Sequence, residues 1–167
     1  MGWPTPPQSN KSNTQDARPL KESNLSISLQ DSSPQSLQSF YKYQILLVDD
    51  GIIHQKLHQK VLENVGCTVY IANHGIEALN FLSKTTFWHE RMNDGETIGL
   101  SVILMDFAMP YLDGLGATRR IRELQGEGKI VGHVPVIGLS HTVIPAEMEQ
   151  ASEAGMVKLL KHKCDYY

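Results

Sequence analysis

Apolar residues in this chain follow two patterns that alternate along most of its length. Short runs of nearly continuous apolar residues predict buried strands at 45–48, 68–72, 102–106, 134–140 and 157–160. Longer stretches with apolar residues every three or four positions predict helices at 53–65, 75–84, 112–127 and 145–154. Because strands and helices alternate, we expect an α/β fold, a doubly wound parallel sheet of five strands with helices on both faces.

The first predicted helix is amphipathic, because its apolar residues recur every four positions at Ile53, Leu57, Val61 and Val65. Gly66 ends this pattern. In contrast, residues 85–100 have no clear period, and we predict that they form a surface loop.

The two ends of the chain differ from its middle. Residues 1–41 are rich in Ser, Gln, Asn and Pro and are predicted to be a disordered tail. The folded domain is expected at 43–161, followed by an atypical end at 162–167. This end is too short for a full fifth helix, so we expect apolar surface beside the first and last strands to be left partly bare.

Composition narrows the class of protein. The net charge is −3 and no basic stripe is present, which argues against nucleic-acid binding. No apolar run approaches the length of a membrane span, and the two cysteines form no disulfide framework. We therefore expect an intracellular protein, cytoplasmic or nuclear, that binds neither nucleic acid nor membranes; its oligomeric state is not predicted.

Two of the predicted strands end on acidic residues. Asp49 and Asp50 follow the first strand, and Asp106 ends the third. The carboxyl ends of parallel strands lie at one edge of a sheet, so the three carboxylates are expected to meet there. Such a cluster repels itself unless it holds a cation, and an all-oxygen acidic site suits Mg²⁺.

The chain resembles the receiver domain of two-component response regulators, most closely the C-terminal receivers of fungal hybrid histidine kinases. The resemblance covers roughly residues 43–161. The matching motifs are Leu-Leu-Val-Asp-Asp at 46–50, Ala-Asn-His-Gly at 72–75, Leu-Met-Asp-x-x-Met-Pro-x-x-Asp-Gly at 104–114, Val-Pro-Val-Ile-Gly-Leu-Ser at 134–140 and Glu-Ala-Gly-Met at 153–156. It implies the flavodoxin-like receiver fold and a role in phosphorelay signalling.

The resemblance also implies roles for individual residues. Asp106 would accept a phosphoryl group from a phosphohistidine on a histidine kinase or a histidine phosphotransfer protein. Mg²⁺ would be held by Asp50, by Asp49 through water, by Asp106 and by the backbone carbonyl of Ala108. Ser140 would contact the bound phosphoryl group. Asp113 is expected to be a turn or cap residue.

The chain departs from the family where strand five ends. The family's phosphate-binding lysine, which is followed by proline, corresponds in position to His162, with Lys161 and Lys163 on either side. A deletion of one residue would make Lys161 the lysine of the site, and we predict Lys161 for this role, with Lys163 as the alternative.

Two other interpretations compete with a working phosphoacceptor. The altered end of the chain favours a degenerate, truncated receiver that binds proteins without being phosphorylated. An aspartate-nucleophile phosphatase would need a second aspartate two residues after the nucleophile, where this chain has Ala108, so we predict no enzyme beyond self-catalysed phosphoryl acceptance. Finally, no histidine shows an evident metal-ligand spacing, and we predict that His54 is a surface residue rather than a ligand.

Overall fold

The structure of the protein is a computed structural model that describes residues 43–91 and 97–162. The predicted disordered tail at 1–41 lies outside the described residues, as does Lys163. Of the predicted atypical end, only His162 is described.

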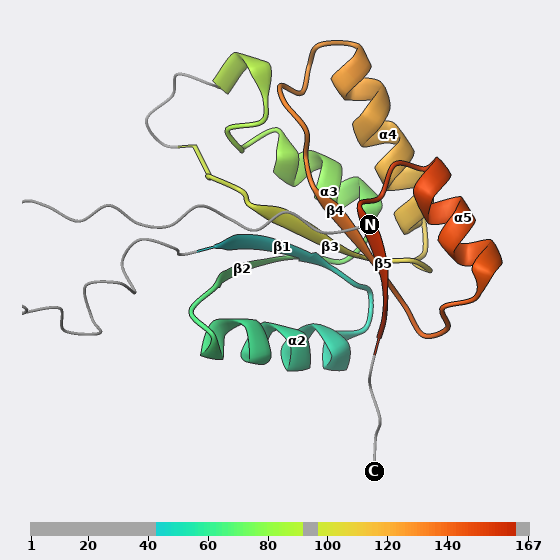
Figure 1. Ribbon diagram of the computed structural model, residues 1–167. Helices are drawn as coiled ribbons and strands as arrows, with labels where there is room; N and C mark the ends of the chain where they lie inside the picture. Colours follow the sequence, from blue (N-terminus) through green and yellow to red (C-terminus); the bar gives the residue numbers. More distant parts are fainter. Residues whose placement is uncertain (1–42, 92–96, 163–167) are drawn as a thin grey trace, which may run out of the picture. The chain divides into compact units, whose positions relative to one another are not determined.

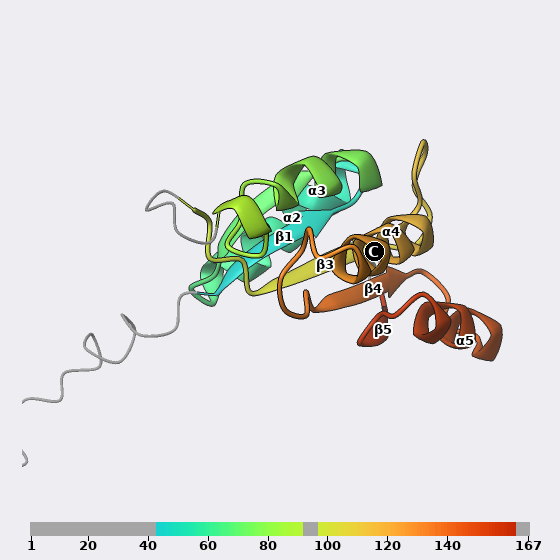
Figure 2. The ribbon, with the colours of Figure 1, turned by 90° about the horizontal axis from the view of Figure 1, so that it is seen from above.

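Five parallel strands form one sheet in the order β2-β1-β3-β4-β5. Figure 2 shows β1, β3, β4 and β5 side by side in this order. Their bounds are β1 Gln44–Val48, β2 Thr68–Ala72, β3 Val102–Asp106, β4 Val136–Ser140 and β5 Lys158–Lys161. This is the flavodoxin-like order, and it confirms the predicted fold. The chain leaves β1 for β2 on one side and reaches β3 on the other, so a crevice is expected at the carboxyl ends of β1 and β3.

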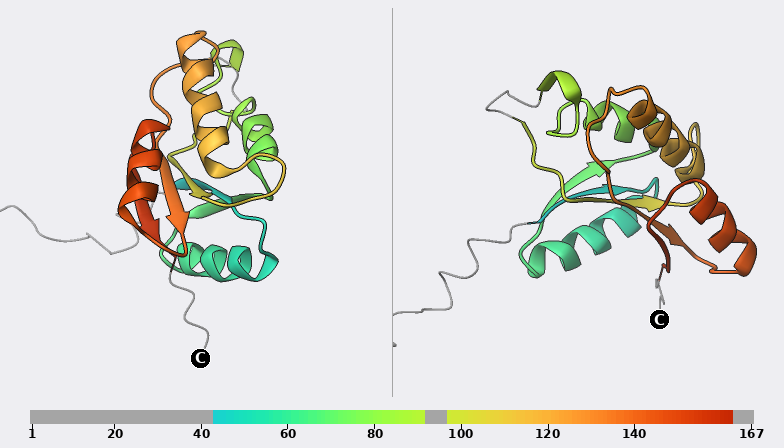
Figure 3. Two further views of the ribbon diagram at one scale, coloured as in Figure 1. Left: turned by 90° about the vertical axis from the view of Figure 1, so that its right-hand side faces the viewer. Right: turned by 45° about the horizontal axis from the view of Figure 1, so that its top comes forward.

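Helices lie on both faces of the sheet. Their bounds are α2 Ile52–Asn64, α3 Gly75–Leu82, α4 Gly114–Gly126 and α5 Pro145–Glu153, with a short 3₁₀ helix at His89–Arg91. The helix α2 lies on one side, and α3, α4 and α5 lie on the other (Figures 1 and 3). Much of the core lies between the sheet and the helices α3 and α4, where Leu46, Leu82, Met105 and Ile121 are fully buried. Within the described residues, no helix is both long and apolar enough to span a membrane.

The apolar stripe of α2 is exposed to solvent. Side-chain exposure is 66% at Ile53, 43% at Leu57 and 54% at Val61, and the only buried residue of α2 is Gln55. The prediction of a helix here is confirmed, but its apolar side is not covered. Within residues 43–91 and 97–162 no helix follows β5, so no second helix packs beside α2 on this face. The expectation of partly bare apolar surface beside the first and last strands is met only at β5, where Leu160 is 37% exposed, because Ile45 and Leu47 of β1 are buried.

The prediction that residues 85–100 form a surface loop is wrong in part. Thr85 is fully buried, donates a hydrogen bond of 2.8 Å to the carbonyl of Leu82, and forms a parallel bridge with Ile98. Leu100 is also buried. These contacts tie the segment to the end of α3 and, through Leu100, to the hydrophobic core, although its sequence has no period that would indicate them.

Substitutions on α2 and α3 test whether the apolar side of α2 is exposed while α3 packs in the core. Replacing Leu57 with glutamine is expected to change the free energy of unfolding by less than about 0.5 kcal/mol, because the side chain is exposed. Replacing the fully buried Leu82 with alanine should cost about 2–5 kcal/mol. Urea denaturation monitored by circular dichroism measures both changes. Equal losses would show that the stripe on α2 is covered in solution.

Candidate functional site

Three carboxylates meet at the carboxyl ends of β1 and β3. These strands pair with Val48 opposite Met105, so the residues that follow them, Asp49 and Asp106, emerge at the same edge of the sheet. Asp49, Asp50 and Asp106 each offer an oxygen, and these oxygens lie within 4.8 Å of one another. Asp49 and Asp106 are buried and Asp50 is exposed. The predicted clustering of the three acids is therefore present in the structure.

The environment of Asp106 disfavours its charged form. Burial is the main cause that raises the pKa of the Asp106 carboxyl above its usual range, and the nearby Asp49 carboxylate raises it further. Hydrogen bonds from the backbone N–H groups of Phe107 and Ala108, together with His141, act in the opposite direction. A cation in the cluster would remove both the repulsion and part of the cost of burial.

The donor set fits a hard cation such as Mg²⁺. Asp49 Oδ2 is buried and has no hydrogen-bond partner among the described residues, whereas Asp49 Oδ1 accepts a bond of 2.7 Å from the N–H of Gly51. A surface depression beside the acids is lined by Asp50, Phe107 and Ala108, among others. All donors in this set are oxygens, which is the ligand type that Mg²⁺ prefers.

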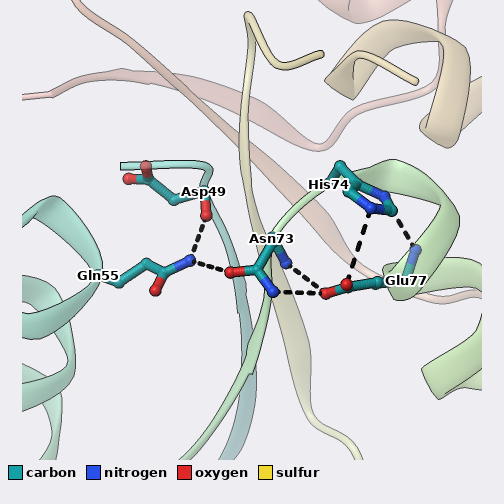
Figure 4. A network of polar contacts seen from close by, with 5 residues as sticks. All are labelled: Asp49, Gln55, Asn73, His74 and Glu77. Atoms are coloured by element: carbon teal, nitrogen blue, oxygen red, sulfur yellow. Dashed lines mark hydrogen bonds and ion pairs between the residues drawn. The ribbon is translucent and has the colours of Figure 1, made fainter. Parts of the chain in front are cut away.

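A polar network holds the backbone at the end of β1 in place (Figure 4). The Gln55 amide on α2 donates to the backbone carbonyl of Asp49 and, at 3.0 Å, to the side-chain oxygen of Asn73. Asn73 donates from its backbone N–H and its side-chain amide to Glu77, each at 2.8 Å. These bonds link β1 to α2 and to the β2–α3 connection, and so position Asp49 through its main chain.

The other predicted site residues occupy different environments. Ser140 is buried at the end of β4, where its hydroxyl contacts the carbonyl of Thr142 and lies 3.1 Å from a carboxylate oxygen of Glu147. Asp113 is the N-cap of α4 and accepts a bond of 2.6 Å from the N–H of Gly116, which confirms its predicted cap role.

Lys161 pairs with Ser140 across the strands β4 and β5, and its side chain is exposed. Its neighbour His162 is buried, with its Nε2 atom 3.7 Å from Asp49 Oδ2. Successive side chains of a strand point to opposite faces, so at this end of β5 histidine, not Lys161, faces Asp49. The role of Lys161 at the site stays a prediction.

Three histidines from two segments, α2 and the residue after β4, gather around His162, a grouping that the sequence interpretation missed. Its ring centroid lies 4.8 Å from that of His54, 4.3 Å from that of His58 and 4.9 Å from that of His141. His54 and His58 are four residues apart on α2, which places them on one face of the helix and was the available signal. His54, predicted to be a surface residue, is 24% exposed, and its Nδ1 atom lies 3.8 Å from Asp49 Oδ1.

This crowding predicts a pH-dependent stability. Burial, followed by the three neighbouring histidines, lowers the pKa of His162 below its usual 6.5. The folded state then binds this proton less readily than the unfolded chain, so stability is fully present above pH 6.5 and is lost as pH falls through the folded-state pKa. We expect denaturant unfolding to show lower stability at acidic pH, by at most about 1.4 kcal/mol per pH unit for each proton. His162→Gln should flatten this dependence, and an identical slope in the variant would contradict the assignment.

The chain belongs to the response regulator receiver domain family, whose model matches residues 45–166. Hybrid signal transduction histidine kinase I of Dictyostelium discoideum is 35% identical over 113 residues, which are 67% of this chain and 6% of that protein. Sensor histidine kinase RcsC of Escherichia coli is 33% identical over 112 residues, 67% of this chain and 10% of that protein. The chain thus spans a tenth or less of the length of these relatives.

The solved structures that resemble this chain include receiver domains, in agreement with the family assignment. The receiver domain of the histidine kinase CKI1 from Arabidopsis thaliana, complexed with Mg²⁺ and BeF₃⁻, superposes with a TM-score of 0.63 at 29% identity, covering 75% of this chain and 85% of that one. The prediction that this chain is a receiver domain of two-component phosphorelay proteins is confirmed, while the fungal affinity stays a prediction. A receiver is a signalling domain and not in itself a catalytic enzyme, and the CKI1 receiver is one that binds Mg²⁺.

Proposed function

We propose that this protein accepts a phosphoryl group on Asp106 in a Mg²⁺-dependent phosphorelay. The observation that carries the proposal is the meeting of three carboxylates at the ends of β1 and β3, with their oxygens within 4.8 Å of one another. An uncompensated cluster of this kind destabilises a fold, so its presence argues for a cation and an anionic substrate.

Asp106 suits the role of nucleophile better than Asp49. Asp49 is fully buried, one of its oxygens accepts the N–H of Gly51, and it faces His54 and His162. The surface depression is lined by Asp50 and by Phe107 and Ala108, which directly follow Asp106, and Asp49 is not among its lining residues. Of the two buried aspartates, Asp106 is therefore the one whose chain borders the depression.

The transfer step conserves atoms and charge. A carboxylate oxygen of Asp106 attacks phosphorus, a P–O bond forms, the P–N bond of the donor phosphohistidine breaks, and the departing imidazole nitrogen takes up a proton from water. Bound Mg²⁺ would supply charge neutralisation and orientation of the phosphoryl oxygens, held by Asp50, by Asp49 through water, by Asp106 and by the carbonyl of Ala108.

Ser140 supplies the response to phosphorylation in this proposal. In the present structure its hydroxyl is engaged with Thr142 and Glu147. A phosphoryl group on Asp106 adds charge and strong acceptor oxygens, which would draw the hydroxyl away from these partners and change the segment before α5. Lys161 is proposed as the cation that moves with Ser140 toward the phosphoryl group on Asp106.

The phosphodonor is proposed to be a histidine kinase or a histidine phosphotransfer protein, and the setting to be cytoplasmic or nuclear. A second candidate function is a protein-binding receiver that is never phosphorylated. It is favoured by one observation, the buried His162 beside Asp49 with Lys161 exposed, since a neutral imidazole is a poorer partner for a phosphoryl group than an ammonium.

The two functions differ in a single experiment. The full chain is incubated with Mg²⁺ and a small-molecule phosphodonor such as acetyl phosphate, and its intact mass is measured. The proposed function predicts a mass increase of one phosphoryl group that hydroxylamine removes, as expected for an acyl phosphate. A folded chain whose mass does not change would favour the protein-binding module.

A further inference from the structure

A second group of donor atoms lies behind the acidic cluster. Asp49, His54 and His162 each direct a carboxylate oxygen or ring nitrogen toward the others, and these three atoms lie within 4.8 Å of one another. They come from the end of β1, the first turn of α2 and the end of β5, so only the folded chain brings them together.

The centre of this group is a buried histidine that the protein itself does not satisfy. The side chain of His162 is 1% exposed, and neither of its ring nitrogens has a hydrogen-bond partner among the described residues. Its contact with Asp49 is 3.7 Å, and that of His54 with Asp49 is 3.8 Å, both too long for hydrogen bonds. Leaving the two buried ring nitrogens of His162 without hydrogen-bond partners is unfavourable, and native structures rarely do so without a ligand.

A glycine at position 51 leaves space for the His54 imidazole beside the Asp49 carboxylate. A Cβ atom at Gly51 would lie 2.9 Å from His54 Nδ1 and 3.1 Å from Asp49 Oδ1. Any other residue at this position would push against the imidazole or the carboxylate. The absence of a side chain at Gly51 thus lets His54 approach Asp49 from α2.

We propose that Asp49, His54 and His162 form a binding site for a divalent transition-metal ion of the zinc class. Two imidazoles and one carboxylate are a common set of three protein ligands for Zn²⁺, with a fourth position left to water or another ligand. Donor atoms around a tetrahedral Zn²⁺ lie about 3.3 Å apart, given bonds of about 2.0–2.1 Å, so side-chain adjustments of roughly an ångström complete the site. The His141 and His58 rings, which pack against His162, would orient its imidazole.

The ligand types separate this site from the Mg²⁺ site. Imidazole nitrogen favours Zn²⁺, Ni²⁺, Co²⁺ or Cu²⁺, whereas Asp50 and Asp106 offer only hard oxygen donors. Asp49 belongs to both groups, so an ion bound by the histidines would withdraw it from Mg²⁺ and oppose phosphorylation. This consequence rests on the proposed function, but the binding of the metal itself does not.

The test is a Co²⁺ titration of the full chain in buffer without Mg²⁺, followed by visible absorption. We expect one equivalent of Co²⁺ to produce the intense bands of a four- or five-coordinate ion. One equivalent of Zn²⁺, the tighter-binding ion, should then remove them. His162→Gln and His54→Ala should each weaken binding by at least about 10–100-fold, the loss known even for residues that only support a ligand.

Two controls make the outcome specific. His133→Ala removes an exposed histidine outside the group and should leave the titration unchanged. Asp106→Asn disables the proposed phosphoacceptor and should also retain the Co²⁺ bands, which separates this proposal from the proposed function. His54 is only partly buried, so His54→Ala keeps the test valid if His162→Gln fails to fold. Co²⁺ affinity unchanged from the parent in both the His54 and His162 variants, or only the pale spectrum of octahedral Co²⁺ in the parent, would overturn the proposal.

Discussion

Replacing Asp106 with asparagine is expected to abolish phosphoryl acceptance, with no mass increase after incubation with acetyl phosphate and Mg²⁺. The amide has the shape of the carboxylate but lacks the anionic oxygen that attacks phosphorus. The variant should fold. The pKa of Asp106 is raised by burial and by Asp49, so a neutral side chain relieves an unfavourable charge. Without Mg²⁺ we therefore expect a melting temperature at neutral pH at or above that of the parent.

The pH dependence of this stability difference has a definite sign. Because the folded-state pKa of Asp106 lies above its usual 3.8, the carboxylate destabilises the fold as pH rises through that range and does so fully above the folded-state pKa. The advantage of Asp106→Asn should thus be present at pH 7 and disappear at acidic pH below the usual value.

Two further aspartates make the experiment specific. Asp113→Asn alters the cap of α4 and should keep phosphorylation, since its carboxylate accepts the N–H of Gly116. Asp49→Asn should weaken Mg²⁺ binding, so that phosphorylation needs a higher Mg²⁺ concentration, while leaving Asp106 as the modified residue, which fragment mass spectrometry can locate. A phosphoryl group found on Asp49, or retained in Asp106→Asn, would show that the nucleophile has been assigned wrongly.

Replacing Gly114 with alanine is expected to destabilise the protein strongly and to impair the same site. A Cβ atom at this position would lie 2.2 Å from the backbone carbonyl oxygen of Asp106 and 3.0 Å from Met105 Cγ. Such a contact forces the backbone of β3 and α4 apart at the nucleophile, and overpacking of this kind costs about 1–3 kcal/mol or more. Denaturant unfolding measures the loss, and mass spectrometry the reduced phosphorylation.

The matched control lies at the other end of the same helix. A Cβ atom at Gly126 would meet nothing within 4 Å, so Gly126→Ala should leave the site unchanged and raise stability by up to about 0.5–1 kcal/mol. Both substitutions add one methyl group to α4. If the two variants were equally stable, the close packing of Gly114 against the nucleophile strand would not exist in solution.

The sheet and the acidic cluster follow from local rules in the sequence. Each apolar run is short and lies between turn or helix signals, so strand and helix alternate, and this alternation requires parallel pairing. Once the strands are parallel, Asp49, Asp50 and Asp106 must emerge at one edge, whatever the details of packing. This explains why the cluster could be predicted from three residues and their positions alone.

Features that depend on contacts between distant segments could not be predicted in the same way. The periodicity of α2 indicates an apolar face but not what covers it, and that face proved to be exposed around Ile53 and Val61. His54 and His162 meet only because the parallel sheet brings the carboxyl ends of β1 and β5 to one edge, although β3 and β4 lie between these strands. The separation of His54 and His162 in the sequence does not indicate that they meet. The four-residue spacing of His54 and His58 does indicate that these two share one face of α2.

Binding of beryllofluoride with Mg²⁺ tests the central claim most directly, because this phosphoryl analogue needs both the nucleophile and the cation. With both added, the melting temperature of the parent chain should rise by ligand linkage, and the amide spectrum should change around Ser140 and α5. The Asp106→Asn variant should show neither effect. A folded parent whose melting temperature and spectrum ignore Mg²⁺ and beryllofluoride would contradict the assignment of these three carboxylates as a phosphoacceptor site.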